Sequence, residues 1–277
     1  MIVPQFWAEA RAQHRQGNRR ITVRRFGWSD AGEAEAQAHA EERARAALQR
    51  LIAGEQLPRR EPRLPYNGAD GVPIREEIVE RHGDALVTRN GYGARCLNTP
   101  DVAFIDIDFG KDFFLWRWIA GPPEKRARRR IDRFLAAHPD WGVRLYRTPA
   151  GFRVLVTHRT FSPDDPAMTE CFRALGVDPV YARMCLNQKC FRARVSAKPW
   201  RIGIGQHLRP RPGTWPVAPE RLPQRRAWVE RYENAARSFA ACRWVETLGN
   251  GTVHPDARRV QELHDRLSGA NTTLPLA

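Results

Sequence analysis

The sequence predicts an α+β fold in which helices pack on a mixed, largely antiparallel sheet. Short segments with β-branched residues and alternating polarity occur along the chain. A turn at residues 148–151 joins two of these segments as a hairpin. Helical patterns separate the others, in the order strand, helix, strands, helix, hairpin, helix, strand. The 277 residues are enough for one large core with appendages.

The N-terminal part predicts a strand followed by a long helix. Residues 20–27 alternate polar and apolar side chains and include β-branched residues, which is typical of a strand. The alanine-rich run that ends at Gly54 predicts a helix, with Ser29 or Asp30 as its cap. Residues 55–71 contain prolines and a turn signal, so we expect a loop there.

The middle of the chain predicts several strands and a basic helix. Strand patterns cover residues 74–83, 85–90, 96–99 and 102–109, and the last is the clearest buried strand. A helix opens at Pro122 and Pro123 and continues to His138, because proline is tolerated in the first turn of a helix.

The C-terminal part predicts a hairpin, three helices and a last strand or strand pair. Hairpin strands are expected at 143–146 and 152–157, a short helix at 162–175, and the last strand or strand pair at 190–204. A proline-rich connector at 210–223 precedes helical patterns at 224–247 and 255–267, and the last ten residues carry little pattern. We therefore expect an α+β core over residues 1–209 and a helical appendage over residues 210–277.

The charge of the chain favours a polyanionic partner. Lys and Arg number 46 against 31 Asp and Glu, which gives a formal charge of +15. An apolar fraction of 42% with nine Trp excludes a purely solvated polycation, so nucleic acid is the first partner to consider. No long apolar segment or signal peptide is evident, so we expect a cytoplasmic protein that does not bind membranes.

Two aspartates lie on the strand at residues 102–109. Asp106 and Asp108 are two residues apart, so both carboxylates project from one face of the strand, which Phe104 shares. Two anions on a buried strand repel each other unless a cation lies between them, and Mg²⁺ or Mn²⁺ would meet that need. In the alternative interpretation, the strand lies at a sheet edge and arginines pair with both carboxylates.

The predicted hairpin could bind phosphate. Its turn contains Gly151, which lets a phosphate approach backbone N–H groups, and Arg147, Thr148 and Arg153 lie alongside. The alternative is an ordinary hairpin with solvated arginines.

A long stretch without acids, residues 183–215, combines cations with aromatic rings. Such a combination suits nucleic acid, because cations neutralise phosphates and rings stack on bases. The residues that we expect to contact nucleic acid are Arg192, Arg194, Lys198, Trp200 and Arg201. The basic helix at 123–138 adds to the positive electrostatic potential of this stretch. The alternative is a basic surface whose aromatics belong to the core.

The cysteines form one close pair, Cys185 and Cys190. A zinc ion needs two further ligands. The candidates are His158, His207, Cys171 and Cys96, and they serve only if the fold brings them together. We therefore do not expect structural zinc and interpret the pair as buried thiols.

Taken in order, the two aspartates on a buried strand, the basic helix and the glycine-containing hairpin resemble the catalytic core of the archaeo-eukaryotic primase superfamily over residues 102–205. The resemblance implies a sheet like that of an RNA-recognition motif and a metal pair at Asp106 and Asp108. It also implies a small-x-His motif that binds nucleotide phosphate, but Arg153 stands where the histidine is expected. Of the later acids that could complete the metal site, only Asp178 is near.

Two functions follow. The first is a primase-polymerase-like nucleotidyltransferase in nucleic-acid replication, in which Asp106 and Asp108 hold Mg²⁺ or Mn²⁺ and the hairpin residues bind nucleotides. The second is a non-catalytic module that binds single-stranded DNA or RNA, with Trp200 as a stacking platform and a degenerate metal site. The paired aspartates also resemble the first motif of haloacid-dehalogenase-type phosphatases, but the Thr or Val expected after Phe109 is missing.

Overall fold

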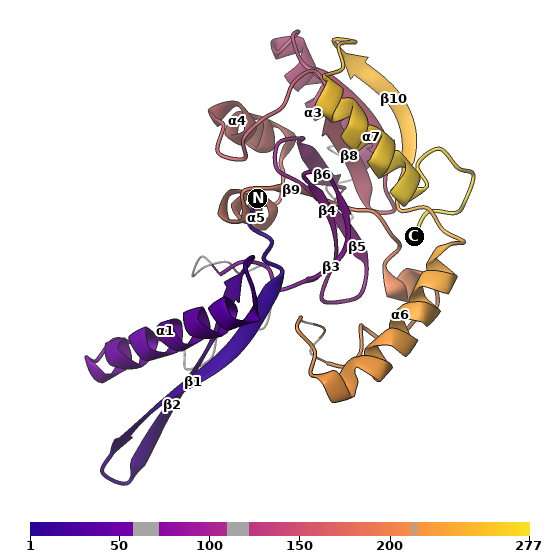
Figure 1. Ribbon diagram of the computed structural model, residues 1–277. Helices are drawn as coiled ribbons and strands as arrows, with labels where there is room; N and C mark the ends of the chain where they lie inside the picture. Colours follow the sequence, from indigo (N-terminus) through magenta and orange to yellow (C-terminus); the bar gives the residue numbers. More distant parts are fainter. Residues whose placement is uncertain (58–71, 110–121, 212, 214) are drawn as a thin grey trace.

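The computed structural model describes residues 1–57, 72–109, 122–211, 213 and 215–277 (Figure 1). These residues form six α-helices and three antiparallel sheets, which confirms the α+β prediction. Most of the loop expected at 55–71 lies outside the described residues. No helix within the described ranges is both long enough and apolar enough to cross a lipid bilayer.

The first sheet is a two-stranded hairpin covered by a helix. Strands β1 (Phe6–Gln16) and β2 (Arg19–Ser29) pair along their whole length, and α1 (Glu33–Ile52) packs on one face. Small side chains allow a close approach: a Cβ added at Gly27 would lie 2.1 Å from the backbone N of Ala40. The sequence did not predict β1. It also placed the helix cap wrongly, since Gly32 is the N-cap residue and provides no side-chain hydrogen bond.

The second sheet has the strand order β3-β4-β5-β9. Its strands are β3 (Glu77–His82), β4 (Ala85–Arg89), β5 (Arg95–Thr99) and β9 (Phe191–Arg194). The first three confirm the predicted strands. The strand or strand pair expected at 190–204 is limited to β9, because Pro199 opens a short 3-10 helix, η2 (Pro199–Arg201).

The third sheet has the strand order β10-β7-β8-β6. It consists of β6 (Phe104–Asp108), β7 (Gly142–Arg147), β8 (Gly151–Val156) and β10 (Arg243–Gly249). β7 and β8 confirm the predicted hairpin, whose turn is closed by a hydrogen bond from Thr148 N to Gly151 O of 2.9 Å. Among the described strands, β6 pairs only with β8 and is therefore an edge strand.

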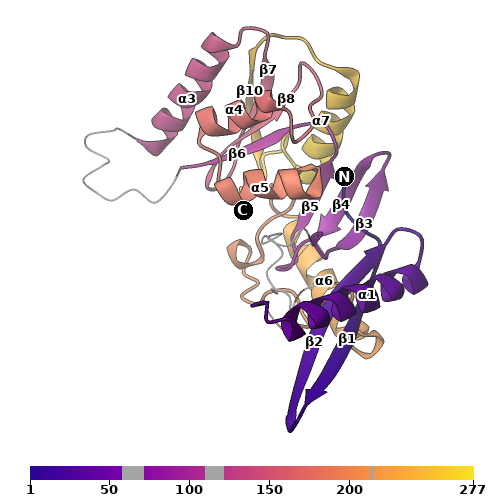
Figure 2. The same cartoon turned by 90° about the vertical axis from the view of Figure 1, so that its left-hand side faces the viewer.

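Helices cover both faces of the third sheet (Figures 1 and 2). On one face, α3 (Pro123–Ala137), α4 (Pro166–Leu175) and α5 (Pro179–Gln188) contribute to a core with β6, β7 and β8. On the other face, Phe104 packs in a second core with the second sheet and with α7 (Pro255–Ser268). The helix α3 confirms the basic helix, whereas α5 was not predicted.

The C-terminal segment belongs to the core. The helix expected at 224–247 ends early: α6 covers Leu222–Ala236, and β10 then pairs with β7. Leu276 forms a bridge with Ala240, and the backbone N of Ala277 donates to Ala240 O at 3.0 Å. Residues beyond 210 therefore supply a strand and a core helix, which differs from the purely helical appendage that we expected.

Candidate nucleic-acid interface and the aspartate pair

Asp106 on β6 stands directly opposite Arg153 on β8. Arg153 donates Nε to Asp106 Oδ1 at 2.7 Å and Nη2 to Oδ2 at 2.9 Å. The guanidinium is 1% exposed, so this carboxylate compensates a buried cation. Burial favours the neutral form of Asp106, but Arg153 outweighs it and holds the pKa of this carboxyl below its usual value. For Asp106 this is the arginine pairing at a sheet edge that the sequence left as an alternative, whereas Asp108 has no arginine partner among the described residues.

Asp108 lies at the exposed end of β6. Partial desolvation and the nearby carboxylates of Asp106 and Asp178 raise its pKa, which Lys198 and Arg201 partly offset. Asp178 is the third acid that the sequence suggested, but its Oδ1 accepts a hydrogen bond from Val180 N at 2.8 Å and caps α5.

These acids do not fit a Mg²⁺ or Mn²⁺ site in this arrangement. A divalent cation needs several oxygen ligands, whereas the charge of Asp106 is already compensated by the buried guanidinium of Arg153, which both of its oxygens contact. Within the part of the chain that the structure describes, no group of three or more acidic, His or Cys side chains could hold a metal ion. The metal pair implied by the primase resemblance therefore has no support from the geometry of Asp106.

The hairpin residues do not form the expected phosphate cradle. Arg153 is inside the sheet. Arg147 donates Nη1 to the backbone oxygens of Thr148 at 2.7 Å and Gly151 at 2.9 Å, and its guanidinium lies 4.5 Å from the Phe109 ring centroid. Thr148 is buried. Arg147 therefore stabilises the turn through Nη1, while its Nη2 lies 3.8 Å from Glu124 Oε2.

Arg192 is also internal. Its Nη2 contacts both oxygens of Glu76 at 2.8 and 2.6 Å, and both side chains are buried. The acid lies far away in the sequence, which is why an acid-free stretch did not reveal it. Arg192 therefore does not face solvent, in contrast to the expected contact with nucleic acid.

The remaining predicted residues gather on one surface, which we call the Trp200 cluster: Arg194, Lys198, Trp200 and Arg201. The Trp200 side chain is 48% exposed, and Lys198 Nζ lies 5.5 Å from its ring centroid. Desolvation and the neighbouring cations, Arg194 and Arg201, lower the pKa of Lys198. Desolvation and the neighbouring Arg194 also lower the pKa of Arg201.

The cluster carries features that suit an incoming anion. Among the described residues, Lys198 and Arg201 have no acidic partner within 4.0 Å, and the buried Nη1 of Arg201 has no hydrogen-bond acceptor. Beside the Trp200 ring lies a cavity of about 300 Å³, lined by Trp200, Ile204, Gly205, Gln206 and His207. Tyr92, from the turn between β4 and β5, packs on Trp200 with ring centroids 5.2 Å apart.

A buried polar network that the sequence did not reveal holds Arg153, the partner of Asp106. Tyr146 donates its hydroxyl to Asp265 Oδ1 at 2.6 Å, and Arg144 Nη2 donates to Oδ2 at 2.9 Å. His264 contacts Asp265 Oδ1 through Nδ1 at 3.1 Å and Arg153 Nη1 through Nε2 at 3.3 Å. The network ties α7 to the third sheet, so Asp106 and Arg153 belong to the architecture of the core.

The five cysteines are free and buried. Burial raises the pKa of the Cys185 thiol, and it raises that of Cys190 to about 11. Both are protonated at neutral pH and behave as small core residues.

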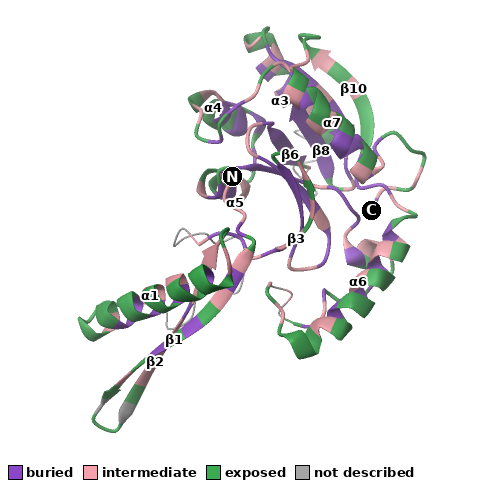
Figure 3. Cartoon of the chain, viewed as in Figure 1, coloured by how far each residue is buried: buried purple, intermediate pink, exposed green. Residues whose placement is uncertain are grey.

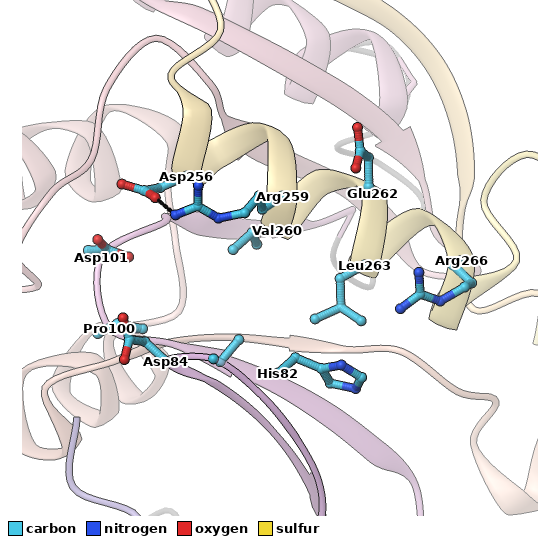
Figure 4. Close-up of a pocket in the computed structure, with 12 residues that line it drawn as sticks. His82, Asp84, Pro100, Asp101, Asp256, Arg259, Val260, Glu262, Leu263 and Arg266 are labelled. Atoms are coloured by element: carbon cyan, nitrogen blue, oxygen red, sulfur yellow. Dashed lines mark hydrogen bonds and ion pairs between the residues drawn. The ribbon is translucent and has the colours of Figure 1, made fainter.

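A second cavity, of about 440 Å³, lies between α7 and the β3–β4 turn (Figure 4). Asp84, Asp101 and Asp256 line one end, and His82 and Arg266 the other. Burial and the two neighbouring carboxylates raise the pKa of Asp101. Because its charges are mixed, this cavity lacks the excess of cations that marks the Trp200 cluster.

Comparisons with protein-family models, with curated proteins and with solved structures give no significant match to this chain.

Proposed function

We propose that the protein binds single-stranded nucleic acid at the Trp200 cluster and that Asp106 serves the fold. The observation that carries this proposal is a half-exposed indole ring with Lys198 over it, in a cluster where neither Lys198 nor Arg201 has an acidic partner within 4.0 Å among the described residues. A base stacks on an exposed aromatic ring whatever its identity, while cations beside the ring neutralise the adjoining phosphates.

The electrostatics of the cluster support the same function. Burial lowers the pKa of both Lys198 and Arg201, and repulsion from Arg194 lowers it further. A phosphodiester placed among them would replace repulsion by attraction. The adjoining cavity of about 300 Å³ gives an unstacked base or its sugar room beside Trp200.

The test is fluorescence anisotropy with a labelled single-stranded oligonucleotide, titrated between 50 and 200 mM salt. Trp200→Ala should weaken binding by about 5- to 150-fold, the factor that corresponds to about 1–3 kcal/mol per stacked base. Trp244→Ala is the matched control, because Trp244 is 43% exposed and lies on β10, at the opposite edge of the third sheet from β6. Equal effects of the two substitutions would remove the stacking role.

Salt dependence tests the cations separately. Lys198→Ala and Arg201→Ala should each reduce the slope of log affinity against log salt by about 0.7, the value for one phosphate contact on a single strand. Affinity that does not change with salt would contradict the electrostatic part of the proposal.

Nucleotide incorporation distinguishes the enzyme from the binding module. We expect no Mn²⁺-dependent incorporation on primed or unprimed templates. We also expect that Asp108→Ala binds single strands as tightly as wild type or more tightly, because it removes a negative charge near Lys198 and Arg201. Incorporation by the wild type that is lost in the variant Asp106→Ala/Asp108→Ala, measured where that variant is folded, would establish the nucleotidyltransferase instead.

A further inference from the structure

The hairpin β1–β2 extends away from the other two sheets (Figures 1 and 2), and we call it the arm. Its strands contact each other and α1 extensively. One face of the arm is covered: Ala10, Ala12 and Val23 form a core with the alanines of α1. The hairpin is joined to the body at its base, where Arg81 Nη2 donates to Gln5 Oε1 at 2.8 Å.

We call the opposite face of the arm its open face. The alternation of side chains along each strand determines which residues lie on it. Pairing places Arg11 opposite Arg24, Gln13 opposite Thr22, and Arg15 opposite Arg20. The open face therefore presents two arginine pairs with a polar, uncharged pair between them. Figure 3 shows exposed and half-buried residues along the arm beyond its base.

The charge on the open face is poorly compensated. Glu9 contacts Arg11 at 3.6 Å and Arg24 at 3.5 Å, so one carboxylate serves two guanidinium groups. Arg20 donates to the neutral amide oxygen of Gln13 at 2.9 Å, and Arg15 donates to Gly17 O at 3.3 Å. Like charges directly opposite each other destabilise a strand pair. An external anion between the paired arginines would relieve this repulsion.

The other side of the same unit has a different charge. Helix α1 carries four glutamates and three arginines, which are Glu33, Glu35, Glu41, Glu42, Arg43, Arg45 and Arg50. Its outer surface is therefore close to neutral and would not hold a polyanion. The excess of positive charge therefore lies on the open face, which gives the arm one binding direction.

We infer that the arm binds the major groove of duplex DNA through its open face. The major groove of B-form DNA is about 12 Å wide and admits a two-stranded β-ribbon. Each of the two strands has 11 residues and is therefore about 36 Å long at roughly 3.3 Å per residue. The ribbon is long enough to follow the groove.

The pattern of side chains fits a groove. The arginine pairs lie on both sides of Gln13 and Thr22 along the ribbon. Arginines contact phosphates or guanine, and Gln and Thr donate to and accept from base edges. An anionic lipid surface would use the arginines but gives no role to the Gln13–Thr22 pair. Duplex RNA is disfavoured because its major groove is deep and too narrow for side chains to read.

This interaction lies on a different surface from the Trp200 cluster and does not depend on it. The test uses the full chain with a labelled 20-base-pair DNA duplex, the RNA duplex of the same sequence, and one single strand. The wild type should bind the DNA duplex more tightly than the RNA duplex. Arg11→Ala/Arg24→Ala should reduce the slope of log affinity for duplex DNA against log salt by about 2, at roughly 0.9 per phosphate contact.

The matched control is Arg45→Ala/Arg50→Ala, which removes the same charge from α1. It should leave the slope unchanged, and Arg11→Lys/Arg24→Lys should retain most of it, because lysine keeps the charge. All three variants should show the wild-type midpoint of thermal unfolding. The single-strand affinity should be unchanged in the arm variants and reduced in Trp200→Ala, so failure of one site is distinguishable from failure of the other.

Three results would overturn the inference. Equal losses in the arm variant and in the α1 control would mean that only total charge matters. Equal affinity for duplex RNA and duplex DNA would exclude the groove. Binding to vesicles with anionic lipid that needs Arg11 and Arg24, without binding to duplex DNA, would assign the open face to a membrane surface.

Discussion

The structural role of Asp106 can be tested by Asp106→Ala. This substitution leaves the guanidinium of Arg153, which is 1% exposed, without its bidentate carboxylate. Arg153 keeps the contacts of Nη1 with Arg194 O at 2.7 Å and with His264 Nε2 at 3.3 Å. A metal ligand would behave in the opposite way, because removal of one of two repelling carboxylates stabilises a protein without metal.

The magnitude follows from the burial of the two partners. Removal of one partner of a fully buried ion pair costs about 3–5 kcal/mol. The Asp106 side chain is 41% exposed, so water can enter the space that it leaves and solvate part of the guanidinium. With this reduction we expect the free energy of unfolding to fall by about 2–3 kcal/mol.

Urea unfolding at pH 7 measures this loss. Asp108→Ala is the matched control, because Asp108 is exposed on the same strand and lacks an arginine partner among the described residues. The pKa of Asp106 is lowered from its ordinary value of 3.8, so its contribution is complete above that value and is lost as the pH falls through the folded-state pKa. The difference between wild type and Asp106→Ala should therefore shrink in acid.

A double-mutant cycle identifies the partner. In an Arg153→Met background, Asp106→Ala should cost little, since no buried cation needs compensation. The reasoning is refuted if Asp106→Ala destabilises the protein no more than Asp108→Ala does, or if its cost is the same with and without Arg153.

Three further predictions concern single residues. Asp108→Asn should increase stability at pH 7, because a raised pKa means that folding disfavours the charged form; in urea titrations the gain should shrink as the pH falls through the folded-state pKa and vanish well below 3.8, where the folded and unfolded chains are both protonated. Glu76→Ala should lower the free energy of unfolding by about 3–5 kcal/mol, because it leaves the buried guanidinium of Arg192 without its carboxylate partner. Gly27→Ala should lower the thermal midpoint, since its Cβ would meet the α1 backbone at 2.1 Å, an overpacking that costs about 1–3 kcal/mol.

Local signals predicted the elements that depend on nearby residues. The hairpin β7–β8 has a tight turn between apolar segments, and β6 lies in a largely apolar segment, so both were predicted. β1 was not predicted because its inward positions are largely alanine, which has low strand propensity. β10 was predicted as helix because its strand conformation depends on pairing with β7, about 100 residues earlier in the chain.

The sequence drew attention to Asp106 and to the basic stretch at 183–215, but it did not reveal the partners of these residues. The alternation on β6 was consistent with two interpretations of Asp106: it could be a metal ligand, or it could pair with an arginine. The register of β6 against β8 favours the arginine pair, because it sets Arg153 directly opposite Asp106. Register is a property of the assembled sheet, and no spacing within either strand specifies it.

The same argument applies to the net charge of +15. Arg192 lies in the acid-free stretch, yet it pairs with Glu76 from a distant part of the chain. Arg225 pairs with Glu77 in the same way, so packing between elements removes cations that a count along the sequence treats as free. A cation remains available to a polyanion only where no acidic element packs beside it. Lys198 and Arg201 of the Trp200 cluster meet this criterion, and so do Arg15 and Arg20 on the open face of the arm. The salt dependence of binding should report these two surfaces separately.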